Sequence, residues 1–106
     1  MGYDPCHDGA LEQLATTRDF AGFVRDAVAA SKKAEMIYLY YAMVLEVSDA
    51  GFDMIAAFHD AGRRIDAYTI QRVDETTLGQ VERLLALKVD QITTDDPEGL
   101  AAALNQ

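Results

Sequence analysis

Short apolar runs alternate with amphipathic segments along the chain, and this alternation restricts the fold more than any other feature. The runs at residues 36–41, 64–70 and 89–93 are rich in strand-forming side chains, and segments with helical periodicity separate them. The first run is continuously apolar and aromatic, as a strand covered on both faces requires. Helices and strands that alternate in this way favour parallel strands joined by right-handed helical crossovers. The sequence therefore predicts an α/β fold.

Four helices are predicted, at residues 18–30, 51–61, 75–87 and 97–104. Gly62 is suited to a left-handed C-terminal cap after the second helix. Asp74 can cap the third helix through its carboxylate, and Asp96 stands before Pro97, a residue favoured at the first position of a helix. The 106 residues are enough for one domain with a buried core, and we expect one.

Three segments have weaker patterns. Residues 1–9 contain Pro5 and Gly9 and are predicted to form a loop. Residues 11–15 favour a short turn of helix. Residues 42–47 extend the first apolar run, and their periodicity leaves open whether they continue the strand or form a loop. The three predicted strands would make a sheet with two unprotected edges.

The composition argues against nucleic acid as a partner and against a membrane span, but it does not identify a function. Eighteen acidic residues against nine basic ones give a net charge of −9, so nucleic acid would be repelled. The longest apolar run, residues 36–45, is about half as long as a membrane span, and none is expected. Cys6 is the single cysteine and cannot form an internal disulfide. The first residues lack the features of a secretory signal, so the compartment stays open, with the cytoplasm favoured.

Two motifs in the last third of the chain resemble a known family. Residues 68–71 read Tyr-Thr-Ile-Gln, and residues 88–97 read Lys-Val-Asp-Gln-Ile-Thr-Thr-Asp-Asp-Pro. In the glycerophosphodiester phosphodiesterases, the seventh barrel strand ends in a motif like Trp-Thr-Val-Asn, and the eighth reads Gly-Val-Asp-Gly-Ile-Ile-Thr-Asp-x-Pro. The chain resembles the C-terminal part of this family over residues 50–104. Its departures, with lysine and glutamine replacing two glycines, are typical of a divergent subfamily.

The resemblance implies a fold and a reaction. The fold is the last three or so βα units of a TIM-type (β/α)8 barrel, here a single partial α/β barrel unit over residues 1–106. The reaction is phosphoric diester hydrolysis in lipid and glycerophosphodiester metabolism, with a divalent cation, Mg²⁺ or Ca²⁺, in the complete enzyme. The family's His-Arg pair, Glu-x-Glu or Glu-x-Asp metal pair and second catalytic histidine have no counterpart here. We therefore expect no catalytic residue, metal ligand or cofactor on this chain, and no activity of the chain by itself.

For the substrate, the resemblance implies that Tyr68 and Thr69 contact a small molecule similar to a glycerophosphodiester. A packed core tyrosine is the competing interpretation of Tyr68. Asp66 lies two residues earlier and shares the same face of its strand. A charged residue inside a strand needs a partner, so we expect Asp66 to form a salt bridge rather than to act in catalysis.

Other polar residues are expected to have structural roles. Thr94, Asp95 and Asp96 lie where the last strand meets the last helix. Helix capping is favoured there, because two carboxylates oppose a phosphate and lack a third ligand for a metal ion. His59 lies on the buried stripe of its helix and His7 in the leading loop, so they are not expected to work together as acid and base.

Two alternatives to the hydrolase interpretation remain open. The chain could be a non-catalytic small α/β interaction module that completes its sheet by self-association through its open strand edges. It could also be a fragment of a longer protein. A stable oligomer in solution favours the first alternative, whereas His-Arg and Glu-x-Glu motifs upstream of the present sequence would favour a parent enzyme.

Overall fold

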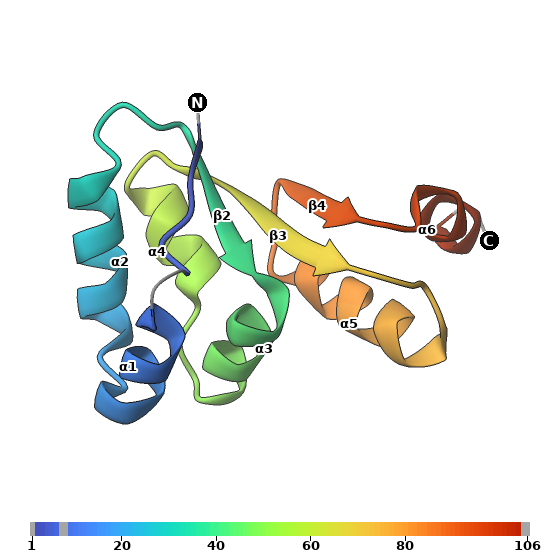
Figure 1. The fold of residues 1–106 in the computed structure, drawn as a ribbon, viewed down its shortest axis with the longest axis horizontal. Helices are drawn as coiled ribbons and strands as arrows, with labels where there is room; N and C mark the ends of the chain where they lie inside the picture. Colours follow the sequence, from blue (N-terminus) through green and yellow to red (C-terminus); the bar gives the residue numbers. More distant parts are fainter. Residues whose placement is uncertain (1, 7–8, 105–106) are drawn as a thin grey trace.

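The computed structural model describes residues 2–6 and 9–104, in which strands alternate with helices (Figure 1). The strands are β1 (Gly2–Tyr3), β2 (Met36–Tyr40), β3 (Arg64–Ile70) and β4 (Gln91–Thr94). The helices are α1 (Ala10–Thr17), α2 (Phe20–Ala30), α3 (Tyr41–Asp49), α4 (Met54–Asp60), α5 (Glu75–Ala86) and α6 (Pro97–Leu104).

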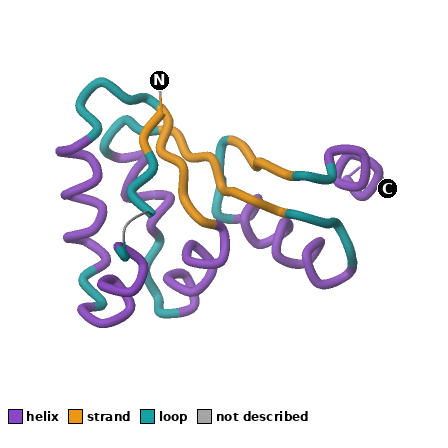
Figure 2. The backbone as a smooth tube through the Cα atoms, viewed as in Figure 1, coloured by secondary structure: helices purple, strands orange, loops and turns teal. Residues whose placement is uncertain are grey.

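The strands form one parallel sheet in the order β1-β2-β3-β4, so each strand lies beside the next one in the sequence. Right-handed crossovers that all step in the same direction place their helices on the same face of a sheet. Figure 1 and Figure 2 show α2, α3, α4 and α5 on one side of the strands. The prediction of an α/β fold with parallel strands and alternating helices is confirmed.

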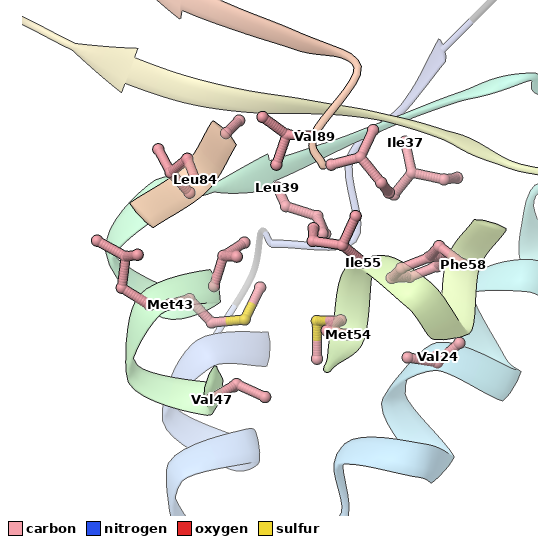
Figure 3. Close-up of a cluster of buried hydrophobic side chains, with 14 of the residues drawn as sticks. Val24, Ile37, Leu39, Met43, Val47, Met54, Ile55, Phe58, Leu84 and Val89 are labelled. Carbon is pink, nitrogen blue, oxygen red and sulfur yellow. The ribbon is translucent and has the colours of Figure 1, made fainter. Parts of the chain in front are cut away.

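The core lies between the sheet and these helices (Figure 3). Ile37 and Leu39 of β2, and Ile65 and Ala67 of β3, are fully buried there. Burying one large apolar side chain contributes about 1.5–3 kcal/mol, so this layer accounts for much of the stability. The buried residues that the helices supply include Val24, Met43, Val44, Met54, Ile55, Phe58, Val81 and Leu84.

No helix of the described residues covers the opposite face of the sheet (Figure 1). Along β2, Tyr38 and Tyr40 alternate with the buried Ile37 and Leu39 and are more exposed. The prediction that this strand is covered on both faces is therefore wrong for the described part of the chain. Its continuous apolar run arises because tyrosines occupy the open face and aliphatic residues the covered one.

The prediction of a loop over residues 1–9 is wrong at Gly2–Tyr3, which pairs with β2 as a fourth strand. Two residues are too few to produce a recognisable pattern. Gly2 has a specific packing reason: a Cβ atom there would lie 1.9 Å from a carbon of the Tyr38 ring. The tyrosine can cover this end of β1 because glycine has no side chain.

Residues 42–47, left open as strand or loop, belong to helix α3. No side chain caps the start of this helix, because extended Tyr40 leads directly into it. Met43, Val44, Leu45 and Val47 are buried around α3, which packs against β3, α4 and α5. A helix buried so widely shows little amphipathic periodicity, so the sequence offered neither a start signal nor a stripe.

Local backbone features move the ends of two predicted helices. α2 begins at Phe20 rather than residue 18, because Arg18 ends α1 with a left-handed φ of 53°. α4 begins at Met54 rather than residue 51, because Gly51 turns the chain with a φ of 93° and Asp53 caps the helix. The residues expected to form one turn of helix at 11–15 lie within the eight-residue α1.

Other predicted boundaries agree more closely with the structure. Gly62 has a φ of 78°, as predicted for a left-handed turn after α4. Asp74 caps α5 in a capping box with Thr77.

The start of the last strand differs from the prediction. It begins at Gln91 rather than Val89, because the chain must first leave α5 through Lys88, whose backbone is left-handed.

Candidate ligand site at the carboxyl edge of the sheet

Several polar and aromatic side chains gather where the parallel strands end. Asp4 and Cys6 follow β1, Tyr40 ends β2, and Tyr68 and Thr69 lie near the end of β3. The carboxyl ends of parallel strands meet at one edge of a sheet, and α/β proteins bind their ligands at that edge. This edge is therefore the candidate site.

Tyr68 is fixed by a hydrogen bond across the sheet. Its hydroxyl donates to the carboxylate of Asp4, at 3.0 and 3.2 Å from the two oxygens, and the Cys6 amide donates to the same carboxylate at 2.8 Å. Burial, reinforced by the hydrogen bond to Asp4, raises the pKa of Tyr68, so the phenol stays protonated. The Tyr40 and Tyr68 ring centroids are 6.2 Å apart. Asp4 and Cys6 were missed in the sequence because β1 was not recognised.

Cys6 is not prepared for nucleophilic chemistry. Burial raises the pKa of its thiol to about 11, and the nearby Asp4 carboxylate acts in the same direction. The thiolate is the reactive form, so at neutral pH the side chain behaves as a small, half-buried apolar group. It packs against the hydrophobic core.

Thr69 lines an open pocket between the ends of β2 and β3. The peptide bond between Tyr68 and Thr69 is cis. Tyr68 does not line the pocket; its ring contacts Tyr40, which does. The two predicted substrate residues thus lie together at this edge, one in the pocket and one supporting its wall. The lining residues are Tyr40, Tyr41, Thr69, Gln71, Arg72, Asp74 and Thr77.

The predicted salt bridge of Asp66 is wrong in the part of the chain that the structure describes. Asp66 is fully buried, and the Thr93 hydroxyl lies 2.8 and 2.9 Å from its two carboxylate oxygens. Burial raises the pKa of Asp66 even though hydrogen bonds from Thr93 and Gln91 oppose the shift. Neutral donors on the neighbouring strand thus take the place of the expected cation.

Asp96 is a helix cap, as predicted. One of its carboxylate oxygens accepts the amide of Gly99 in α6 at 3.0 Å, and the other accepts the amide of Val73 at 3.1 Å. Both oxygens are therefore used in joining α6 to the loop after β3. This corner does not fit a divalent cation, and no group of three His, Cys, Asp or Glu side chains within residues 2–6 and 9–104 could hold one.

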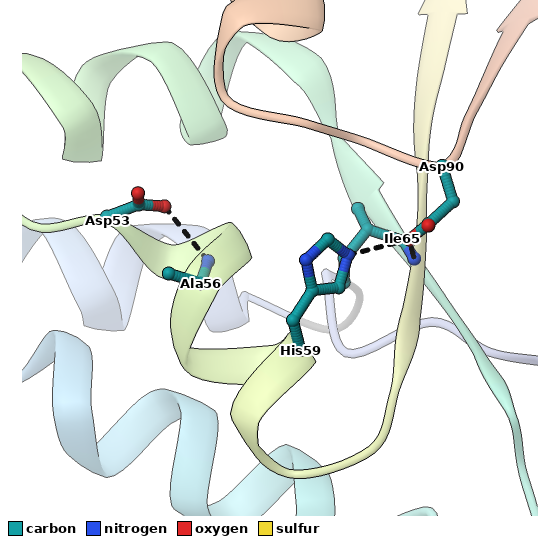
Figure 4. A network of polar contacts seen from close by, with 5 residues as sticks. All are labelled: Asp53, Ala56, His59, Ile65 and Asp90. Atoms are coloured by element: carbon teal, nitrogen blue, oxygen red, sulfur yellow. Dashed lines mark hydrogen bonds and ion pairs between the residues drawn. The ribbon is translucent and has the colours of Figure 1, made fainter.

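His59 lies at the other edge of the sheet, where the strands begin. Its Nε2 is 2.8 Å from Oδ2 of Asp90, and the same oxygen accepts the Ile65 amide at 2.7 Å (Figure 4). Burial opposes ionisation of Asp90, but the hydrogen bonds from Ile65 and His59 outweigh it and hold the pKa of Asp90 below its usual range. His59 thus ties α4 to β3 and β4. His7 lies outside the described residues.

None of the described helices combines the length and apolar character needed to cross a membrane.

Asp53 in Figure 4 also has a structural role, since it caps α4 through the Ala56 amide at 2.9 Å. Asp74 and Thr77, which form the capping box of α5, line the pocket that also contains Thr69, whereas Asp53, Asp90 and Asp96 do not line it. Comparison of the chain with protein-family models, curated proteins and solved structures finds no match.

Proposed function

We propose that this chain is the C-terminal portion of a phosphodiester hydrolase similar to the glycerophosphodiester phosphodiesterases. It supplies part of the wall that holds the alcohol side of the diester, and the catalytic and metal-binding residues come from the remainder of the enzyme. The observation that carries the proposal is the position of Tyr68 and Thr69 at the carboxyl end of β3, beside an open pocket. Thr69 matches the family motif, and Tyr68 occupies the position where the family has tryptophan.

The strand order supports a barrel origin. In a (β/α)8 barrel each strand pairs with the next one in the sequence, and the helices all lie outside. The order β1-β2-β3-β4 with helices on one face has this arrangement, whereas a doubly wound sheet would reverse direction at some point. In a barrel, the open face with Tyr38, Asp66 and Thr93 would become the interior.

The backbone at Lys88 also supports the resemblance. Lys88 has a φ of 71°, a conformation that strongly favours glycine, and the family motif has glycine at this position. The chain therefore keeps the backbone turn that the family's glycine allows while replacing the residue. This is the departure expected of a divergent relative rather than of an unrelated sequence.

Within this function, Tyr68 has a positioning role. Asp4 fixes its hydroxyl, so the ring presents a constant surface to Tyr40, which lines the pocket. Thr69 offers a hydroxyl to the polar end of the alcohol. In the complete enzyme, a bound divalent cation would polarise the phosphate of the diester.

The proposal is tested by comparing the chain with a reconstituted barrel. The isolated chain is assayed with a chromogenic phosphodiester and Mg²⁺, and no turnover is expected. A fusion carrying the N-terminal barrel segment of a glycerophosphodiester phosphodiesterase, followed by this chain, is expected to regain metal-dependent turnover. Cooperative melting of the fusion, measured by circular dichroism, shows that it has folded. Turnover by the isolated chain, or a folded fusion without turnover, contradicts the proposal.

A second candidate function is favoured by the sheet edges. Within the described residues, β1 and β4 each pair with one strand only, which leaves one side of each open. A non-catalytic module could complete its sheet through these edges by binding a second copy. A stable dimer by light scattering, together with no binding of any glycerophosphodiester, would favour this function over the hydrolase.

A further inference from the structure

The pocket lined by Thr69 contains one positive and one negative side chain, Arg72 and Asp74. Within the described residues, the Arg72 guanidinium forms no hydrogen bond or salt bridge, although its charge interacts with that of Asp74. The Asp74 carboxylate accepts the Thr77 amide at 2.9 Å, and this hydrogen bond lowers its pKa, so it is ionised at neutral pH. The pocket thus carries two opposite charges that are not joined in an ion pair.

Two tyrosines form the aromatic part of the same pocket. The rings of Tyr40 and Tyr41 have centroids 5.5 Å apart and meet edge to face, at 71°. An aromatic face attracts an ammonium group, and a carboxylate strengthens that attraction. A guanidinium prefers a carboxylate or phosphate, which it can bind through two parallel hydrogen bonds. The lining therefore offers partners for an ammonium and for an anionic group at once.

We propose that this pocket selects phosphodiesters whose alcohol part carries both an ammonium and a carboxylate, as in a diester of a hydroxy amino acid. Arg72 binds the carboxylate, and Asp74 with the two tyrosines binds the ammonium. This inference rests on the proposed function, since it assigns the alcohol side of the diester to the pocket that Thr69 lines. Arg72 and Asp74 are then specificity-determining residues.

Matched ligands test the selectivity on the chain as it exists. Amide resonances of the ¹⁵N-labelled protein are followed by NMR during titration with glycerophosphoserine, glycerophosphoethanolamine and glycerophosphoglycerol. The first has an ammonium and a carboxylate, the second an ammonium, and the third neither. We expect glycerophosphoserine to bind most tightly, with the largest shifts at Thr69, Gln71 and Arg72. Inorganic phosphate serves as a fourth ligand and is expected to bind more weakly than all three.

Variants assign each charge to its group. Arg72→Gln is expected to weaken glycerophosphoserine roughly two- to fivefold, the effect of one exposed ion pair, and to leave glycerophosphoethanolamine unchanged. Asp74→Asn keeps a good helix cap and is expected to weaken both ammonium ligands by a similar factor. Lys32→Gln makes the same charge change as Arg72→Gln, but at an exposed site between α2 and β2, and is expected to change nothing.

The possible failures have different meanings. Equal binding of the three diesters, or inorganic phosphate binding as tightly as glycerophosphoserine, would overturn the selectivity and leave the proposed function standing. A loss in Lys32→Gln equal to that in Arg72→Gln would also overturn it, because net charge rather than the pocket would then be responsible. If a folded chain binds none of the diesters, the selectivity fails, and turnover by the fusion decides the proposed function separately.

Discussion

The hydroxyl of Tyr68 donates a hydrogen bond to the carboxylate of Asp4, and so joins the end of β3 to the segment that follows β1. β1 itself pairs with β2 through Gly2 and Tyr3 only. The contact reaches across the intervening strand β2 and holds the N-terminal segment against the middle of the sheet. It also fixes the ring of Tyr68, for which the family resemblance implies contact with a substrate.

Replacing Tyr68 with phenylalanine is expected to lower the free energy of unfolding by about 1 kcal/mol, because one hydrogen bond to a carboxylate is lost while the ring remains. Urea denaturation measures the change. Tyr38→Phe is the matched control on the same face, since the structure gives the Tyr38 hydroxyl no hydrogen bond within the described residues. Equal losses in the two variants would mean that the Asp4 contact contributes nothing specific.

Cys6 is expected to react slowly with iodoacetamide. Its pKa is raised from the ordinary 9.0 to about 11, so little thiolate forms in the folded protein at neutral or mildly alkaline pH. By linkage, the protonated thiol favours the folded state below pH 9.0, and this contribution is lost as the pH rises through about 11. The rate is followed by mass spectrometry, with the urea-unfolded chain as the reference. Equal rates for the two forms would contradict the raised pKa.

The fold class was predictable because its signals are local and repeated. Runs such as residues 64–70 have strand composition, and Asp74 and Asp96 are side chains that cap helices by their own chemistry. The missed elements lack such signals. Strand β1 depends on the distant partner β2, and α3 is apolar around most of its surface because it packs against several neighbours. Tertiary contacts, rather than local sequence patterns, determine strand β1 and helix α3.

The candidate site was predictable in part for a related reason. Tyr68 and Thr69 stood out through their motif, and the structure places both at the carboxyl edge. Asp4 could not be connected with Tyr68 from the sequence, because the link requires β1 and β3 to lie in the same sheet. For Asp66, the assumption that a buried carboxylate needs a cation was the error, since a hydroxyl donor and a raised pKa meet the same need.

Asp66→Asn is expected to be neutral or stabilising at neutral pH. The pKa of Asp66 is raised above its ordinary 3.8, so the folded state prefers the protonated acid. That preference favours folding below pH 3.8 and is lost as the pH rises through the folded-state pKa. Asparagine removes the buried charge and retains an oxygen that can accept the Thr93 hydroxyl.

Thr93→Val makes the complementary test of the same pair. It leaves Gln91 as the remaining side-chain donor to the Asp66 carboxylate and is expected to lower the free energy of unfolding by about 1 kcal/mol at neutral pH. In the Asp66→Asn background, the same substitution should cost less. Urea midpoints of the four proteins give the coupling energy. Additive effects would show that the hydroxyl does not stabilise the carboxylate.

Asp90→Asn is expected to lower the free energy of unfolding at neutral pH by about 1–2 kcal/mol, because the Ile65 amide and His59 then face a neutral group. The pKa of Asp90 is depressed below 3.8, so its stabilisation is present above pH 3.8 and is lost as the pH falls through the folded-state pKa. The difference from the natural chain should therefore shrink in acid. The exposed Asp95→Asn is the control, and a pH-independent difference would contradict the assignment.

Lys88 follows the C-terminal cap of α5, in a turn that favours glycine. Its amide donates to the Leu85 carbonyl at 3.0 Å, and the Val89 amide donates to the Leu84 carbonyl at 3.3 Å, while Lys88 has a φ of 71°. This is a Schellman turn, which places the residue after the cap in the left-handed region. In that region the Cβ atom of lysine lies too close to the backbone carbonyl oxygen, and this contact destabilises the turn.

Lys88→Gly is therefore expected to raise the free energy of unfolding by about 0.5–1 kcal/mol, since relief of the Cβ contact exceeds the added backbone entropy of glycine in the unfolded chain. Lys88→Ala keeps Cβ and removes the charge, so it separates backbone strain from electrostatics and should give no gain. Urea denaturation of the three proteins measures both effects. A gain in the alanine variant equal to that in the glycine variant would mean that the charge, and not the left-handed backbone, sets the stability of this turn.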